Sequence, residues 1–286
     1  MIKNLFFPAL VSCMFIGCGS NESSADNQDQ VATDSAYTWN LGVALWTFHN
    51  VDFPTSLSMA DSAGLKLIEP NTFHSAGKDL RDTLLGKLSP EGIEKLKSYV
   101  QQHGITVGSL YLGGGNTVDD WKKDFEKAKQ FGVKFVTAEP PMKMWDVVDS
   151  LAGVYGMKVA IHEHWKGTSI YWHPDSVLAA IKDHKNFGAC ADLGHWPKSG
   201  INSLDAVKKL DGHIISVHLK DIAAMNDPKL VDVRVGTGIV PMPEIFAELK
   251  RQKFEGNIYI ERDSIENPTN VPSVIAAVKY FNETAE

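Results

Sequence analysis

The chain has 286 residues, of which 43% are apolar and 22% charged, with 23 glycines and 13 prolines. This is the composition of a globular protein, and it excludes collagen-like, low-complexity and wholly disordered chains. The net charge of -7 argues against a nucleic-acid partner, because phosphate recognition needs a basic face. Three cysteines in a chain of this length do not form a disulfide framework.

The N-terminal residues have the pattern of an export signal. Lys3 supplies a positive charge, and residues 5–16 form an apolar run shorter than the ~20 residues that span a bilayer. Residues 15–18, Phe-Ile-Gly-Cys, resemble the bacterial lipobox, in which the cysteine is lipidated and becomes the new N-terminus; Leu is usual at the first position. We therefore expect a signal peptide over 1–17 and an exported lipoprotein, anchored through Cys18 to a membrane at its periplasmic face or at the cell surface.

A polar stretch follows this cysteine. Ser, Asn, Asp, Glu and Gln dominate residues 19–35, which cannot bury apolar area and suit a flexible tether. We expect a lipidated, disordered tether over 18–38 and a folded domain over 39–286. The alternative for the apolar run is a buried first strand with a chance cysteine. Once the signal is cleaved, Cys190 is the one remaining free thiol, so no disulfide is expected within the mature chain.

Short apolar runs rich in β-forming residues alternate with amphipathic stretches along the rest of the chain. Helix signals lie between the runs: Ser89 followed by Pro90, Thr117 with an acidic residue at the third helical position, and Asn202 followed by Ser203. The predicted strands are residues 42–48, 65–69, 106–112, 134–139, 158–164, 188–192, 214–220 and 257–261.

Eight strands with helical crossovers in roughly 250 residues predict an α/β fold, a single (β/α)8 TIM barrel. The alternative is a doubly wound open sheet. No Gly-rich phosphate loop follows the first strand, and the three glycines at 113–115 lack the spacing of a dinucleotide-binding motif.

Barrel strands point alternate residues inward, which makes the pattern within each run informative. In residues 214–220, Val217 and Leu219 suit the helix layer, and His218 and Lys220 then point inward. The same alternation turns ionisable residues inward at the ends of four other runs. Barrel enzymes build their sites at this C-terminal end of the strands. The residues at those ends are Glu139, His162 and His164, Asp192, and Glu261.

Carboxylates and imidazoles that converge on one mouth need a cation or strong pairing, because buried charges are otherwise costly. Glu139, Asp192, His218 and Glu261 offer three carboxylates and one imidazole. Such a set suits one divalent ion, Mn, Mg, Co or Zn. It is less like a structural zinc site, which prefers cysteine.

Motifs at the last three predicted strands carry a family resemblance. They are Ala191-Asp192-Leu193-Gly194-His195, Val217-His218-Leu219-Lys220-Asp221, Gly236-Thr237-Gly238 and Ile260-Glu261. With these motifs the chain resembles, over roughly residues 41–281, the xylose isomerase-like TIM barrel family of sugar phosphate isomerases and epimerases, which has an endonuclease branch. The resemblance implies a divalent-metal site and substrate contacts at the barrel mouth. The implied ligands are Asp192, His218 and Glu261, and the implied substrate contacts are His195 and Lys220.

One position departs from the family pattern. Many relatives carry the fourth ligand as a glutamate on strand five, where this chain has His162. We expect Glu139, one strand earlier, to supply that carboxylate and His162 to contact substrate; His162 as the ligand is the alternative. The departure also weakens the interpretation of this chain as an epimerase that uses two glutamates, because histidine is a neutral base with a pKa nearer 7.

The chemistry expected at this mouth is removal of a proton next to a carbonyl of a sugar, with the metal holding the developing negative charge. Glu261 and His164 are the candidate acid/base groups, and Lys220 stabilises negative charge. Alternatively, His164 only orients a hydroxyl.

Further residues are expected to contact the sugar at the rim of the barrel. The alternatives are that the aromatic residues simply cover the mouth and that the glutamate caps its strand. These residues are Trp46, Glu69, Trp165 and Trp196.

We expect a metal-dependent isomerase or epimerase of a non-phosphorylated sugar or keto-sugar. The alternatives are a metal-dependent lyase or hydrolase of 3-keto-glycosides and a non-catalytic carbohydrate-binding lipoprotein. Phosphorylated substrates fit poorly, because they are scarce outside the cytoplasm and no Arg/Lys cluster marks a phosphate site.

Overall fold

The computed structural model describes residues 39–285. The predicted signal peptide over 1–17, the predicted tether over 18–38 and its lipidation site, Cys18, lie outside the described residues. Within residues 39–285, no helix has both the length and the apolar character needed to cross a membrane.

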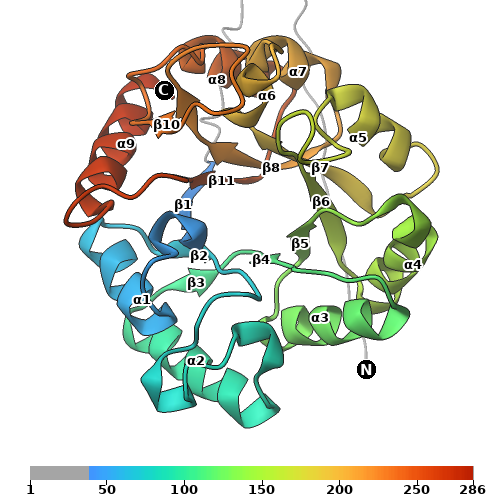
Figure 1. Cartoon of the computed structure of the whole chain (residues 1–286), viewed down its shortest axis with the longest axis vertical. Coiled ribbons are helices and arrows are strands. Elements are labelled where there is room, and N and C mark those ends of the chain that lie inside the picture. Colours follow the sequence, from blue (N-terminus) through green and yellow to red (C-terminus); the bar gives the residue numbers. More distant parts are fainter. Residues whose placement is uncertain (1–38, 286) are drawn as a thin grey trace, which may run out of the picture. The chain divides into compact units, whose positions relative to one another are not determined.

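A parallel sheet of nine strand segments forms the centre of the fold, and helices surround it (Figure 1). The spatial order is β3-β2-β1-β11-β8-β7-β6-β5-β4, in which consecutive strands lie side by side as in a TIM barrel. The segments are β1 (Asn40–Ala44), β2 (Leu67–Glu69), β3 (Thr106–Val107), β4 (Leu110–Tyr111), β5 (Phe135–Ala138), β6 (Lys158–His162), β7 (Phe187–Asp192), β8 (Ile214–Leu219) and β11 (Asn257–Ile260).

The sheet closes almost completely through one interrupted strand. Segments β3 and β4 belong to the single predicted run 106–112; β3 pairs with β2, and β4 pairs with β5. Gly108 lies at the interruption, where a Cβ would approach the Tyr259 hydroxyl to 2.4 Å, so only glycine fits. The predicted barrel is therefore confirmed, with its third strand in two pieces.

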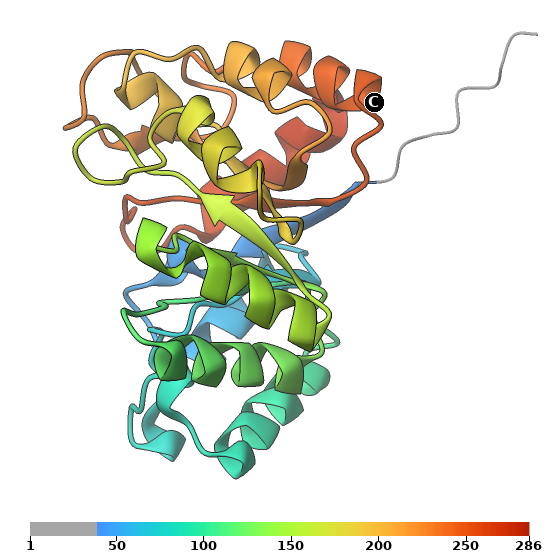
Figure 2. The same ribbon diagram turned by 90° about the vertical axis from the view of Figure 1, so that its right-hand side faces the viewer.

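Helices cover the outside of the barrel, and the three with predicted N-caps, Ser89, Thr117 and Asn202, begin at those residues. The Ser89 hydroxyl accepts a bond from the Gly92 N–H, and Thr117 forms a reciprocal capping box with Asp120. Figure 2 shows α3 and α4 along one side of the barrel. The helices are α1 (Phe53–Ser62), α2 (Pro90–Gln102), α3 (Val118–Phe131), α4 (Trp145–Tyr155), α5 (Pro174–Ile181), α6 (His195–Lys198), α7 (Ser203–Lys209), α8 (Met242–Arg251) and α9 (Val271–Thr284).

Short elements complete the described chain. An antiparallel pair follows the seventh barrel strand, and four 3-10 helices lie in the connections. These elements are β9 (Asp221–Ile222), β10 (Asp232–Val233), η1 (Leu45–Phe48), η2 (Lys78–Leu80), η3 (Leu85–Lys87) and η4 (Met142–Met144).

The first predicted strand is wrong in its second half. It ends at Ala44, and Leu45–Phe48 forms η1, closed by the bond from the His49 N–H to the Trp46 carbonyl. A short apolar run does not distinguish a strand from a helical turn by periodicity. This turn leaves Trp46 37% exposed at the rim of the cavity described below.

The core lies between sheet and helices, where alternation predicts it. Val217, Leu219, Ile258 and Ile260 are fully buried in this apolar layer. The other face of each strand points into the barrel, and there the side chains are polar near the C-terminal ends. That end is where the candidate site lies.

Candidate metal centre and active site

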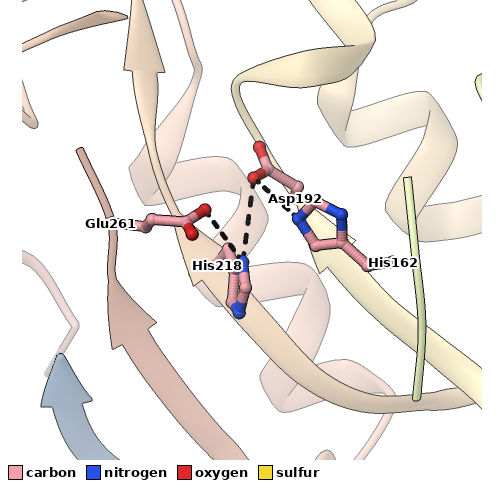
Figure 3. A group of neighbouring side chains, drawn as sticks. All are labelled: His162, Asp192, His218 and Glu261. Atoms are coloured by element: carbon pink, nitrogen blue, oxygen red, sulfur yellow. Dashed lines mark hydrogen bonds and ion pairs between the residues drawn. The ribbon is translucent and has the colours of Figure 1, made fainter. Parts of the chain in front are cut away.

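Four buried side chains from different strand ends converge inside the barrel (Figure 3). His162 ends β6, Asp192 ends β7, His218 lies in β8, and Glu261 directly follows β11. Each offers one ligand atom, and these atoms all lie within 4.8 Å of one another. We call these residues the four-residue group.

His218 is oriented by a carboxylate behind it. Its Nε2 lies 2.7 Å from Oε1 of Glu69, and its Nδ1 lies 3.0 Å from Oε2 of Glu261 and 3.8 Å from Oδ2 of Asp192. A neutral imidazole has a single N–H. When Nε2–H donates to Glu69, Nδ1 presents its lone pair to two carboxylates. Such a cluster of acceptors needs a cation or a proton between them.

Glu69 is itself held firmly. Its other oxygen accepts hydrogen bonds from Ser109 Oγ at 2.6 Å and Thr137 Oγ1 at 2.5 Å. The side chain is only 2% exposed. These contacts give Glu69 the position of a partner for the His218 imidazole, which is the arrangement that orients histidine ligands in metal sites.

His162 and Asp192 point toward the same centre without hydrogen bonds at the facing atoms. His162 Nδ1 lies 3.2 Å from Glu139 Oε1, and its Nε2 lies 3.4 Å from Asp192 Oδ2. Nε2 and Oδ2 are both buried and make no hydrogen bond, although Oδ2 forms an ion pair with the Lys220 ammonium at 3.1 Å. Asp192 Oδ1 accepts bonds from the N–H groups of Gly194 and His195, which aim Oδ2 inward. Two buried acceptors that face each other in this way suit a cation between them.

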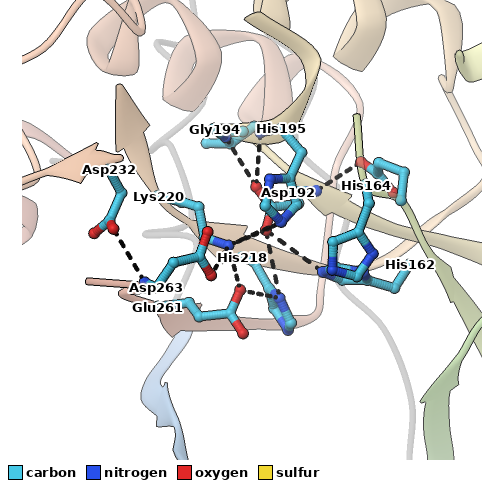
Figure 4. A network of polar contacts seen from close by, with 12 residues as sticks. His162, His164, Asp192, Gly194, His195, His218, Lys220, Asp232, Glu261 and Asp263 are labelled. Carbon is cyan, nitrogen blue, oxygen red and sulfur yellow. Dashed lines mark hydrogen bonds and ion pairs between the residues drawn. The ribbon is translucent and has the colours of Figure 1, made fainter. Parts of the chain in front are cut away.

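The charge balance also favours a cation. Glu69, Asp192 and Glu261 are buried carboxylates, and the ammonium of Lys220 lies 3.1 Å from Asp192 Oδ2 and 3.0 Å from Glu261 Oε2. Lys220 also contacts Asp263 at 3.0 Å (Figure 4). Burial alone would lower the pKa of His162, but Asp192 and Glu139 hold it well above its usual value. Protonated imidazole therefore shares the compensation of these buried carboxylates with Lys220, because unbalanced buried charge is costly. A bound divalent ion would take the place of such protons. The donor set and its charge fit a divalent ion.

Burial and pairing act in opposite directions on the ionisation of this site. Burial alone would lower the pKa of Lys220, but Asp192, Asp263 and Glu261 hold that pKa well above its usual value. Burial alone would raise the pKa of Glu261, but His218 and Lys220 hold it well below its usual range. Lys220 therefore stays cationic and Glu261 anionic near neutral pH.

Glu139 occupies a second cluster behind His162. Its Oε1 lies 3.2 Å from His162 Nδ1, 2.5 Å from His164 Nδ1 and 3.1 Å from the Tyr111 hydroxyl, and its Oε2 accepts a bond from Ser169 at 2.5 Å. Burial raises the pKa of Glu139, but the hydrogen bonds from both histidines hold it well below its usual range. Both oxygens are thus engaged as acceptors.

The four-residue group contains His162, which was the alternative to Glu139 as fourth ligand. The structure brings His162 into it and leaves Glu139 outside, in a group with His162 and His164. The carboxylate count favours Glu139, but its two oxygens already accept hydrogen bonds from His162, His164 and Ser169.

His164 follows β6 and is half-buried at the edge of a cavity of about 140 Å3. Its Nδ1 contacts Glu139, and no described residue hydrogen-bonds its Nε2. The cavity is lined by Ala44, Trp46, Glu69, Asn71, Phe73, Tyr111, His162, His164, His195, Lys220, Glu261 and Asp263.

Two of the predicted rim tryptophans do not line this cavity. Trp196 is fully buried in the core, so its predicted place at the rim is wrong. Trp165 packs against His195, with the Lys198 ammonium 4.3 Å from its ring centre. A tryptophan just past a strand end can turn either inward or outward, and the sequence did not distinguish the two.

Tyr111, Phe73 and Asp263 also line the cavity and were not predicted from the sequence. Tyr111 ends β4 between Leu110 and Leu112, so the alternation used for other strands identifies it as inward-facing. Phe73 lies in the connection after β2 and Asp263 follows β11 by three residues; neither carries a pattern of its own.

The fold and site define a TIM barrel with a candidate divalent-metal centre at the C-terminal ends of its strands. A family model described as xylose isomerase-like TIM barrel matches residues 57–282. The chain belongs to this family.

Individual relatives agree with that assignment. An inosose dehydratase from Clostridium botulinum is 25% identical over 272 residues, covering 75% of this chain and 90% of the relative. The structure of an uncharacterised protein from Parabacteroides distasonis is 31% identical, with a TM-score of 0.68, and covers 86% of this chain and 98% of the other. The IOLI protein, solved with a zinc atom bound, shares the fold at 20% identity, with a TM-score of 0.70 and the same two coverages.

Proposed function

We propose that this protein is a metal-dependent enzyme that removes a proton from the carbon next to a carbonyl of a non-phosphorylated sugar or keto-sugar. The observation that carries the proposal is the placement of His164, a base held through Nδ1, at the cavity that His162 and Glu261 of the four-residue group also line. The zinc atom of the IOLI protein supports a metal in this fold.

The four-residue group would hold one divalent ion, Mn, Mg, Co or Zn, through an imidazole nitrogen of His162 and of His218 and a carboxylate oxygen of Asp192 and of Glu261. When bound, such an ion supplies a Lewis acid that polarises the substrate carbonyl. Glu69 behind His218 and Glu139 behind His162 would keep both rings aimed at the ion.

His164 would take the proton. Donation of Nδ1–H to Glu139 over 2.5 Å leaves the lone pair on Nε2, which no described residue engages. A base oriented in this way by a third group is the arrangement that makes proton transfer efficient. Glu261 lines the same cavity and would serve as the second acid/base group.

Lys220 would stabilise the negative charge that develops on the substrate oxygen. Its ammonium remains charged, and Asp192, Glu261 and Asp263 hold it in place. His195 Nε2 lies 3.0 Å from the same ammonium. Among the described residues that line the cavity, Lys220 is the one Lys or Arg, and it is already paired with carboxylates. This favours an uncharged sugar over a phosphorylated one.

Isomerisation and elimination share the proton abstraction and differ in the next step. In the first, the proton returns to the substrate; in the second, a group leaves the neighbouring carbon. The relative named inosose dehydratase supports the second outcome, because a dehydratase removes water. A lyase or hydrolase of keto-glycosides is therefore our second candidate.

The test is carbon-bound proton exchange in D2O. Metal-analysed protein is incubated with a panel of keto-sugars and 3-keto-glucosides, and mass spectrometry follows deuterium in the recovered sugar and release of an aglycone. We expect deuterium incorporation, and aglycone release would identify elimination. Val154→Ala, at an exposed position on α4, is the control for substitution itself. If metal-loaded protein exchanges and releases nothing across the panel, a carbohydrate-binding protein replaces the enzyme.

A further inference from the structure

Three aromatic rings form one side of the cavity and continue outward from it. Trp46 and Phe73 meet edge to face with ring centres 6.0 Å apart, and Phe73 meets Tyr111 in the same way at 5.9 Å. All three line the cavity. We call them the aromatic wall.

Two of the three rings in this wall are exposed. Tyr111 is half-buried, and its hydroxyl donates to Glu139 at 3.1 Å, beside the proposed base. Trp46 is 37% and Phe73 41% exposed. Adjacent exposed aromatic rings that open from a cavity mark a ligand-binding surface more often than isolated exposed side chains do.

One face of the Trp46 ring is covered by a second ring. That face stacks on His49, with ring centres 4.3 Å apart and planes 18° from parallel, and His49 Nδ1 contacts the Trp46 carbonyl at 2.7 Å. His49 is not among the residues that line the cavity, so the covered face is turned away from it. His49 therefore holds the indole in position in the absence of a ligand.

Buried and exposed residues line different parts of the cavity. His162 and Glu261 of the four-residue group are 2% and 4% exposed, whereas Trp46 and Phe73 are 37% and 41% exposed. A first ring held beside the four-residue group would therefore leave the two exposed aromatic rings to a second ring.

We propose that the aromatic wall binds a second six-membered ring of the substrate, so that the substrate is a glycoside and the ring on the wall is its leaving ring. This inference rests on the proposed function for the first ring. The shared chemistry is a flat ring face against an aromatic surface, which both a sugar ring and an aryl ring provide.

The test compares ligands with one and two rings. Binding of methyl β-D-glucoside, phenyl β-D-glucoside and cellobiose to the metal-analysed protein is measured by calorimetry and tryptophan fluorescence. We expect the phenyl glucoside, cellobiose or both to bind about fivefold more tightly than the methyl glucoside, as expected for one aromatic contact. Whichever of phenyl glucoside and cellobiose gains more affinity over methyl glucoside shows whether the leaving ring is an aryl group or a sugar.

Variants then test whether the aromatic wall causes the higher affinity for two-ring ligands. Trp46→Ala and Phe73→Ala should abolish the two-ring preference while metal content stays unchanged; the control Val154→Ala should retain the preference. Equal affinities of all three ligands for the wild type, absence of binding, or a preference that survives both wall variants would overturn the proposal. Deuterium exchange into a one-ring keto-sugar without any two-ring preference would leave the proposed function intact and refute this inference alone.

Discussion

Replacing Glu139 by glutamine and, separately, His162 by alanine distinguishes the two candidates for the fourth metal ligand. In the structure His162 belongs to the four-residue group, whereas Glu139 contacts His162 from outside it. We therefore expect Glu139→Gln to retain metal with weakened affinity, and His162→Ala to lose stoichiometric metal at neutral pH.

The size of the two effects follows from the contacts. A hydrogen bond to a charged group contributes about 1.5–3 kcal/mol, against about 1 kcal/mol for a neutral pair. Glutamine keeps one acceptor oxygen for His162 but loses the charge, so about 1.4 kcal/mol, or a tenfold weaker metal affinity, is expected. This agrees with the ~10–100-fold losses typical of outer partners of metal ligands. Removing the His162 imidazole removes the ligand atom itself, so metal affinity should fall by more than that range.

The assay is a competition between protein and a fluorescent chelator at pH 7, with metal content checked by mass spectrometry of the dialysed protein. Thermal unfolding of both apo variants controls for loss of the fold. His162→Gln provides a second variant that keeps a polar group beside Asp192. Full metal occupancy in His162→Ala together with metal loss in Glu139→Gln would refute the reasoning and make Glu139 the ligand.

Three further predictions follow from other parts of the chain. His164→Gln should bind metal normally and slow deuterium exchange by about 10²–10⁴; equal loss of metal and exchange would show that His164 acts on the metal instead. Burial raises the pKa of Asp124 from 3.8 to about 6, so its ionisation destabilises the fold progressively as pH rises from about 4 to 6. Asp124→Asn, whose amide oxygen can still accept the Gly114 N–H, should therefore be more stable by up to about 3 kcal/mol at pH 7 and unchanged at pH 3 in urea unfolding; equal effects at both pH values would contradict this. We propose that Cys18 carries a lipid, so palmitate labelling in a bacterial host should be lost in Cys18→Ala, and an unmodified Cys18 in native protein would refute the anchor.

Much of the fold follows from local sequence. The apolar runs, the N-caps at Ser89, Thr117 and Asn202, and the alternation within the last strands predicted the barrel and the polar side of each strand end. These features depend on neighbours within a few residues, which is why they can be read without the tertiary structure. The same local reading failed at 45–48, where strand and helical turn share one apolar pattern.

The composition of the site depended on distances around the barrel, which periodicity does not contain. Alternation turns both Glu139 and His162 inward. Only the packed structure groups His162 with Asp192 and Glu139 with His164. Likewise, the sequence suggested aromatic residues at the mouth, and the tertiary structure decided which ones. It buries Trp196 and joins Trp46, Phe73 and Tyr111 into one surface. Side chains from separate strands become neighbours only when the sheet closes.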